Sequence, residues 1–270
     1  METEDSQSLS ELQEKALKCN IITTEFREPD LSDEITAVAF APSESTRKLL
    51  SNLPCVGKKL KNQAELKKQE HKLRALSFSM TDCEQTKGMN VLQHGCSVRE
   101  HYFAILDHLE GKIDLHTTSN WKIPAWLDDY KEQILKTVPD RFIMDRYLTV
   151  HDCGKPGMRE VDEDGRQHFP NHAEASEREY RRLSEGDSEH KESQNIIAYL
   201  IAHDMDIHML KADGIPEFAK RPTAFAHLLA GLAEITSNAA MFGGIESISF
   251  KIKYKQLDQR GKALCKLIFA

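Results

Sequence analysis

Several polar side chains lie on the apolar faces of predicted helices, where water cannot satisfy them. His94, His151 and His203 each share a face with apolar residues at helical spacings of three and four. Glu234 is the only formally charged residue in segment 222–245. A buried imidazole or carboxylate needs a hydrogen-bond partner or a metal ion. Each residue taken singly is most simply a hydrogen-bonded core residue, but together, on separate helices, they predict a metal site.

Asp152 and His172 extend this set of candidate ligands. Asp152 directly follows His151 at the end of a predicted helix, and His172 begins another helix behind Asn171. His168 lies four residues before His172 in a charged loop, so we interpret it as a surface histidine. Mixed imidazole and carboxylate ligands suit Mn, Fe, Ni or Zn, or Mg where carboxylates dominate. The lack of cysteine ligands argues against a structural zinc site.

Helices must position these side chains, because apolar residues recur at spacings of three and four along most of the chain from Met89 onward. The periodicity predicts helices over residues 91–105, 126–137, 141–151, 172–183, 193–210 and 223–242. Gly154 and Pro156 follow the third of these helices and end it. A charged loop over 158–169 comes next. We therefore predict an all-α fold.

The C-terminal segment shows a different pattern. Apolar residues alternate from Ile248 to Tyr254, and residues 263–269 are mostly apolar, which predicts a small β-hairpin. One face of the predicted strand would carry Lys251, Lys253 and Lys255. Such a basic ribbon could follow a nucleic-acid backbone, but lysines that guard an exposed strand edge are the simpler interpretation.

These patterns divide the chain into three segments. A polar, mainly helical N-terminal extension covers 1–88, the helical metal-binding domain covers 89–244, and the hairpin segment 245–270 packs on the body. Within the extension, a charged helix is predicted from Asp5 to Lys18. Segment 49–70 contains a lysine-rich run, which would contact a phosphate or polyanion or, more simply, form a solvated helix face.

Composition excludes several classes of protein. The chain has 270 residues, of which 40% are hydrophobic and 29% charged, so it is neither low-complexity nor wholly disordered. It has no apolar stretch of membrane-spanning length, and its acidic start is unlike a secretory signal. Its six cysteines are scattered, as expected of free thiols in a cytoplasmic protein. The formal charge of −7 argues against a general nucleic-acid coat.

The order of these residues resembles the HD-domain superfamily of metal-dependent phosphohydrolases. The most specific segments read HDCGKP at 151–156, GRQHF at 165–169 and NHAEAS at 171–176. They are similar to the corresponding stretch of HD domains related to those of tRNA nucleotidyltransferases. The QHG at 93–95 also resembles the first-histidine helix of that family. The resemblance covers residues 89–242 and does not extend to the N-terminal extension.

The resemblance implies a site for one or two divalent metal ions. One ion would be held by His94, His151, Asp152 and Glu234, and a second by His172 and His203, with Asp152 bridging the two. Glu234 departs from the family, whose last ligand is an aspartate, so it marks either a working or a weakened site. Cys153 is interpreted as a spacer. Around His203 the rival candidates are Asp204, Asp206 and His208.

The implied activity is hydrolysis of a phosphomonoester or phosphodiester by metal-activated water, on a nucleotide or a nucleic-acid end. Lys155 would contact the phosphate or stabilise the developing charge, although a helix C-terminus also favours a lysine. Arg99 and the arginines at 178, 181 and 182 could bind substrate phosphate, but the latter group more simply pairs with neighbouring glutamates.

Alternatives of the same fold are a 2′,3′-cyclic phosphodiesterase and a di-iron oxygenase. A third is a degenerate HD module that binds a nucleotide or a protein partner without turnover.

Overall fold

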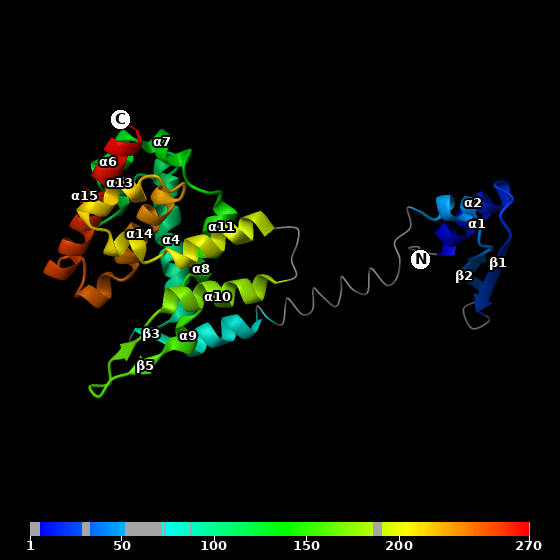
Figure 1. Ribbon diagram of the computed structural model, residues 1–270, viewed down its shortest axis with the longest axis horizontal. Coiled ribbons are helices and arrows are strands. Elements are labelled where there is room, and N and C mark those ends of the chain that lie inside the picture. The colour runs from blue at the N-terminus through cyan, green and yellow to red at the C-terminus, as the bar shows by residue number, and fades with distance from the viewer. Residues whose placement is uncertain are drawn as a thin grey trace. The chain divides into compact units, whose positions relative to one another are not determined.

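A computed structural model describes residues 6–28, 33–51, 72, 74–86, 88–185 and 191–269. The chain forms two compact units, Met1–Glu70 and His71–Ala270 (Figure 1). The predicted boundary at residue 88 therefore falls within the second unit. Residues 74–82 are helical, and Leu76 and Met80 on this helix are buried in the same core as the rest of that unit.

The first unit combines helices with a β-hairpin. Its described elements are α1 (Ser6–Lys18), β1 (Thr23–Glu28), β2 (Glu34–Phe40) and α2 (Glu44–Leu49). The charged N-terminal helix was predicted correctly, but the antiparallel β1–β2 hairpin was not predicted. Polar residues dominate β1, which is why the segment was included in a mainly helical extension. Strand β2, by contrast, contains the β-branched and aromatic residues typical of strands. The lysine-rich run lies outside the described residues.

The second unit is mainly helical, as predicted for an all-α fold. Its elements before the central loop are β3 (Glu84–Thr86), β4 (Met89–Asn90), α4 (Val91–Leu109), α5 (Leu115–Thr118), α6 (Ala125–Asp129), α7 (Lys131–Leu135), α8 (Arg141–Val150) and α9 (Lys155–Met158). The elements that follow are β5 (Glu160–Val161), β6 (Gln167–His168), α10 (His172–Ser184), α11 (Lys191–Ala202), α12 (Asp206–Met209), η2 (Ala212–Gly214), α13 (Ile215–Phe218), α14 (Ala224–Ser237), η3 (Ala239–Phe242) and α15 (Ile248–Ile268). The charged loop predicted over 158–169 is a small β5–β6 hairpin.

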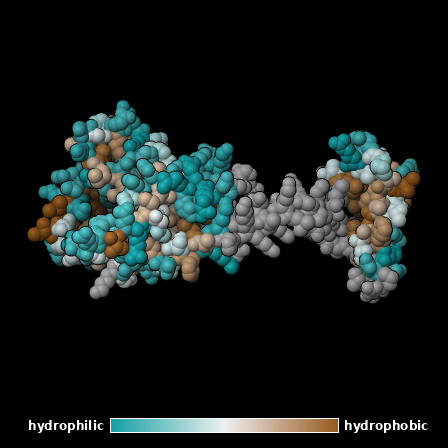
Figure 2. Space-filling view, turned by 60° about the horizontal axis from the view of Figure 1, so that its bottom comes forward, coloured by the Kyte–Doolittle hydropathy of each residue, from teal (hydrophilic) through white to brown (hydrophobic). Residues whose placement is uncertain are grey.

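Helix α14 lies at the centre of this unit. It is buried on almost every side and packs against α4, α12 and α15. Helix α4 packs in turn on α8, α8 on α11, and α11 on α10 (Figure 1). A helix that is apolar all round must lie in a core, which is why the single charged side chain of α14 stands out. The face of the unit seen in Figure 2 is mainly hydrophilic, with isolated apolar residues.

Sequence explains where two of the three helices that meet at the candidate site begin. Asn90 caps α4 by accepting a hydrogen bond from the Gln93 backbone N–H, and the Gln93 side chain accepts one from the Asn90 N–H. Asp140 caps α8 by accepting a single hydrogen bond from the backbone N–H of Ile143.

None of the described helices combines the length and apolar composition that a membrane span requires.

The predicted C-terminal hairpin is wrong, because residues 248–268 form one helix, α15. Ser247 caps it by accepting a hydrogen bond from the Phe250 N–H. The alternating pattern was misleading, since Ile248 is 78% exposed whereas Phe250 is buried. Along the whole segment the buried positions are Phe250, Leu257, Gly261, Leu264 and Cys265, which follow a helical period. The lysines at 251, 253 and 255 therefore lie on a helix and guard no strand edge.

Candidate metal centre

Three helices bring four of the predicted ligands together. His94 lies on α4, Glu234 on α14, and His151 and Asp152 directly follow α8. The Nε2 atom of His94 lies 3.2 Å from Glu234 Oε1 and 3.6 Å from Asp152 Oδ2. The Nε2 atom of His151 lies 3.3 Å from the same Asp152 oxygen and 3.6 Å from Glu234 Oε2. His94, His151 and Glu234 offer ligand atoms that all lie within 4.8 Å of one another, so they could hold a metal ion.

Glycines allow the helices to approach this closely. A Cβ on Gly95 would lie 2.4 Å from the carbonyl oxygen of Thr149, so α4 contacts the backbone of α8 at this position. A Cβ on Gly154 would lie 2.3 Å from the backbone nitrogen of Ser176. The Gly154 N–H donates to the Ser176 hydroxyl over 2.9 Å. Both glycines are therefore required by tight backbone packing beside His94 and Asp152.

The hydrogen bonds of His151 set its tautomer. Its Nδ1 lies 2.8 Å from the backbone carbonyl oxygen of Leu148. A carbonyl can only accept, so Nδ1 carries the proton and, in the neutral ring, Nε2 presents its lone pair to the cluster. His172 has the same arrangement, with its Nδ1 2.8 Å from the carbonyl oxygen of Phe169. Metal-binding histidines typically donate their second nitrogen to a carbonyl or carboxylate in this way.

His94 is the side chain that most needs a partner. It is completely buried, its Nε2 meets Glu234 at ion-pair distance without hydrogen-bond geometry, and its Nδ1 has no hydrogen-bond partner among the described residues. Buried polar atoms are rarely left without one, because the loss of hydration is unfavourable. A cation at the cluster would satisfy Nε2, and the donor set around it fits a divalent metal ion.

The cluster is closed on one side and open on the other. The side chains of His94, His151 and Asp152 are at most 3% exposed, whereas those of Glu234 and His172 are 22% and 20% exposed. Solvent therefore reaches the cluster past Glu234 and His172. A small molecule would have to approach from the same side.

Electrostatic interactions keep the two carboxylates ionised. Burial by itself would raise the pKa of Asp152, but the positive charges of His151 and Lys155 outweigh it and hold this pKa well below its ordinary value. Burial opposes ionisation of Glu234 too, yet His94 and His151 lower its pKa far more. Burial would lower the pKa of His151, but Asp152 and Asp204 raise it well above its ordinary value. The cluster thus combines ionised carboxylates with His151, whose protonation the neighbouring carboxylates favour.

Lys155 lies at the edge of the cluster. Its Nζ donates to Asp152 Oδ2 over 2.6 Å and to Gln85 Oε1 over 3.0 Å, and it lies 5.5 Å from the centre of the Phe169 ring. The side chain is 9% exposed. A nearly buried ammonium group held between a carboxylate and an amide has a fixed position beside the candidate ligands.

The two histidines predicted for a second ion lie differently. His172 Nε2 is 3.7 Å from Asp152 Oδ1, the carboxylate oxygen that does not face His94 and His151. His203 Nδ1 instead bonds to Asp206 Oδ2 over 2.9 Å, and the same oxygen accepts a hydrogen bond from Arg221. No contact between His203 and the cluster occurs among the described ion pairs.

The other predicted residues lie outside the cluster. Arg99 pairs with Asp145 across α4 and α8 at 3.4 Å. His168 is exposed and bonds to Asp162 at 2.9 Å, consistent with a surface histidine. Cys153 is buried and its thiol donates to the carbonyl oxygen of Ser176 over 3.3 Å; burial raises its pKa to about 12. Arg181 and Arg182 bond to Glu177 and Glu179 on the same helix, as expected for helical ion pairs.

Sequence reasoning missed two side chains that position the cluster. Asn238 donates its amide N–H to Glu234 Oε1 over 2.7 Å. Its spacing of four residues from Glu234 is a helical signal that could have revealed it. Gln85, which accepts from Lys155, lies 70 residues earlier in the chain, and no local pattern links the two.

A second group of histidines and a carboxylate lies near the surface. His108, His116 and Asp128 also offer ligand atoms close together. His108 Nδ1 accepts a hydrogen bond from the Leu115 backbone N–H over 3.2 Å, so the neutral ring carries its proton on Nε2. That Nε2 lies 3.1 Å from Asp128 Oδ1, and His116 Nε2 lies 2.9 Å from Asp128 Oδ2. This cluster is satisfied by its own hydrogen bonds.

No protein-family model matches the sequence, and a search of curated proteins found no match.

Proposed function

We propose that this protein is a metal-dependent phosphohydrolase of the HD type. The observation that carries the proposal is the convergence of His94, His151, Asp152 and Glu234, with a completely buried His94 that lacks a hydrogen-bond partner among the described residues. The likeness of the HDCGKP segment to HD domains supports the same interpretation.

These four residues would hold one divalent ion, which we expect to be Mn, Fe, Ni, Zn or Mg. The two oxygens of Asp152 face different histidines, Oδ2 towards His94 and His151 and Oδ1 towards His172. Asp152 is therefore suited to bridge to a second ion bound by His172. His203 could join it through Nε2, since Asp206 engages only Nδ1. A bound divalent ion would supply a Lewis acid that acidifies water and shields phosphoryl charge.

The protein's own groups would bind and orient the substrate. The ammonium of Lys155 is fixed within 2.6 Å of Asp152 and offers a positive charge to a phosphate oxygen. A phosphate that enters past Glu234 and His172 would meet this charge in a largely buried environment, where electrostatic attraction is less screened than in water. A nucleotide or a nucleic-acid end is the proposed substrate class, by analogy with HD domains.

Metal content and phosphate release test the proposal together. We expect purified full-length protein, free of any affinity tag, to contain bound transition metal by plasma mass spectrometry and to release phosphate from nucleotides or oligonucleotide ends. Asp152→Ala should lose both properties, because it removes the carboxylate that faces three histidines. His116→Ala is the matched control and should keep both. Full activity in Asp152→Ala would refute the proposal.

A second candidate is an HD module that binds a nucleotide without turnover. Glu234 favours it, because this side chain stands where the family has aspartate and one of its oxygens already accepts from Asn238. Glu234→Asp separates the two functions. Increased phosphate release would indicate a weakened site, whereas decreased release at unchanged folding would show that the glutamate works as a ligand.

A further inference from the structure

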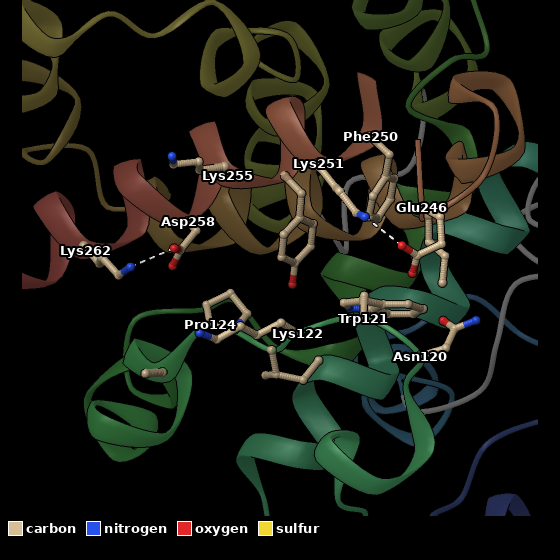
Figure 3. Close-up of a pocket in the computed structure, with 14 residues that line it drawn as sticks. Asn120, Trp121, Lys122, Pro124, Glu246, Phe250, Lys251, Lys255, Asp258 and Lys262 are labelled. Carbon is tan, nitrogen blue, oxygen red and sulfur yellow. Dashed lines mark hydrogen bonds and ion pairs between the residues drawn. The ribbon is translucent and has the colours of Figure 1, made fainter. Parts of the chain in front are cut away.

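A cavity separate from the metal centre lies between segment 120–125 and helix α15. Its volume is about 520 Å³, within the range of small-molecule sites. Figure 3 shows Trp121, Lys122 and Pro124 on the side of segment 120–125, with Lys251, Lys255 and Lys262 along α15 opposite. None of the metal-centre residues lines it. Whatever binds here is therefore independent of the proposed function.

Aromatic side chains form the apolar wall of the cavity. Phe250 and Tyr254 stack on each other with their ring centres 5.6 Å apart. Trp121 contributes a third, half-buried ring, which makes an edge-to-face contact with His101 with the ring centres 6.0 Å apart. Burial raises the pKa of Tyr254 above its ordinary value, and a hydrogen bond with Trp121 partly offsets this. Flat, rigid walls of this kind favour a planar ring as ligand.

The polar rim of the cavity is positively charged, although the protein as a whole is negative. Two of the four lining lysines have partners, since Lys251 bonds to Glu246 and Lys262 to Asp258, each over 2.7 Å. Figure 3 shows these ion pairs at opposite ends of the cavity. For Lys122 and Lys255, no ion pair occurs among the described residues. Lys122 and Lys255 thus add two positive charges to the lining beyond those held in these ion pairs.

We propose that this cavity binds an aromatic phosphate the size of a mononucleotide. The base would stack against Trp121 and Tyr254, and the phosphate would interact with the ammonium groups of Lys122 and Lys255. Lysines are compact point charges suited to phosphate, and stacking on aromatic rings tolerates any of the four bases. The cavity would then be an accessory nucleotide site.

Tryptophan fluorescence offers a local probe of this site. The chain has two tryptophans, and Trp126 is only 2% exposed, so a ligand in the cavity would act mainly on Trp121. We would titrate the metal-stripped full-length protein with AMP, GMP, CMP and UMP, and measure affinity by calorimetry in parallel. At least one nucleotide should bind saturably and quench the fluorescence. Adenosine or inorganic phosphate alone should bind at least about tenfold more weakly than AMP if AMP is that ligand.

Charge reversal on α15 and in segment 120–125 provides the matched comparison. Lys122→Glu combined with Lys255→Glu should weaken nucleotide binding at least about tenfold. Lys253→Glu repeats the charge reversal of Lys255→Glu on the same helix, but Lys253 packs over Phe242 and does not line the cavity, so affinity should change less than about twofold. Trp121→Phe should remove the fluorescence signal. The proposal fails if no nucleotide binds, or if Lys253→Glu weakens binding as much as the double variant.

Discussion

The buried cluster of His94, His151 and Glu234 and the surface cluster of His108, His116 and Asp128 contain the same kinds of side chain. They differ in what the other imidazole nitrogen contacts. His151 donates Nδ1–H to a carbonyl, so Nε2 is the nitrogen that faces the cluster, whereas His108 accepts an N–H at Nδ1 and keeps its proton on Nε2. A metal ion could bind the neutral ring of His151 without a change of tautomer, whereas the neutral ring of His108 would first have to give up its Nε2 proton. Backbone contacts, more than residue type, thus distinguish a candidate metal site from a hydrogen-bonded surface cluster.

The largest difference between the clusters should appear in metal retention. We expect His94→Ala to lose the bound ion completely, because it removes a ligand whose position is fixed by burial. His116→Ala makes the same truncation in the surface cluster and should leave the metal content unchanged. Plasma mass spectrometry after extensive dialysis measures both. Equal loss in the two variants would mean that the tautomers do not discriminate the clusters.

Backbone packing beside the buried cluster should dominate stability. Gly95→Ala places a Cβ 2.4 Å from the Thr149 carbonyl oxygen and should lower the free energy of unfolding by about 2–3 kcal/mol. Gly157→Ala is the control, since a Cβ there meets no atom within 4 Å, and should change stability by less than about 0.5 kcal/mol. Urea denaturation followed by circular dichroism gives both values. Similar changes in the free energy of unfolding for the two variants would show that α4 and α8 can move apart without loss of stability.

The hydrogen bond to Glu234 should tune the buried cluster. Asn238→Ala removes the amide that donates to Glu234 Oε1 and should weaken metal binding about tenfold, as expected for a group that orients a ligand. Ser237→Ala, which removes a hydroxyl bonded to Ser97, is the neighbouring control. A competition titration with a metal-binding dye measures the two affinities. Unchanged affinity in Asn238→Ala would show that packing orients the Glu234 side chain without help from this hydrogen bond.

The pH dependence of the free energy of unfolding should reflect His227, which is completely buried. Burial lowers the pKa of His227, which therefore stays neutral in the folded state at a pH where the unfolded chain binds a proton. Its contribution to stability is present above the unfolded pKa of about 6.5 and is lost as the pH falls below it, by up to about 1.4 kcal/mol per pH unit. His227→Phe should flatten this slope between pH 6.5 and pH 5.

His116→Phe is the control for the pH experiment, because His116 is exposed and should leave the slope unchanged. Thermal unfolding over the pH series gives both slopes. An unaltered slope in His227→Phe would show that other groups govern the acid sensitivity.

The longer helices α4, α8, α10, α11 and α14 of the second unit were predictable because each has a clear apolar period. The capping box of Asn90 and Gln93 and the apolar face of α4 are readable within a single segment. Helix α15 was missed because Ile248, Phe250, Ile252 and Tyr254 alternate over a window too short to separate the two periods. The tertiary structure supplies the missing information, because Gly261 lets α15 pack directly against the Trp126 ring of α6.

Sequence by itself determined which side chains could form a metal site and on which helix faces they lie, since residue type and periodicity are local properties. It identified His94, His151, His203 and Glu234 in this way, and added Asp152 and His172 as neighbours of helix ends. Tertiary structure decided which of them meet, which ring nitrogen of His151 faces the cluster, and that His203 bonds to Asp206. These features depend on contacts between segments far apart in the chain, such as Lys155 with Gln85, and such contacts leave no periodic signal in the sequence.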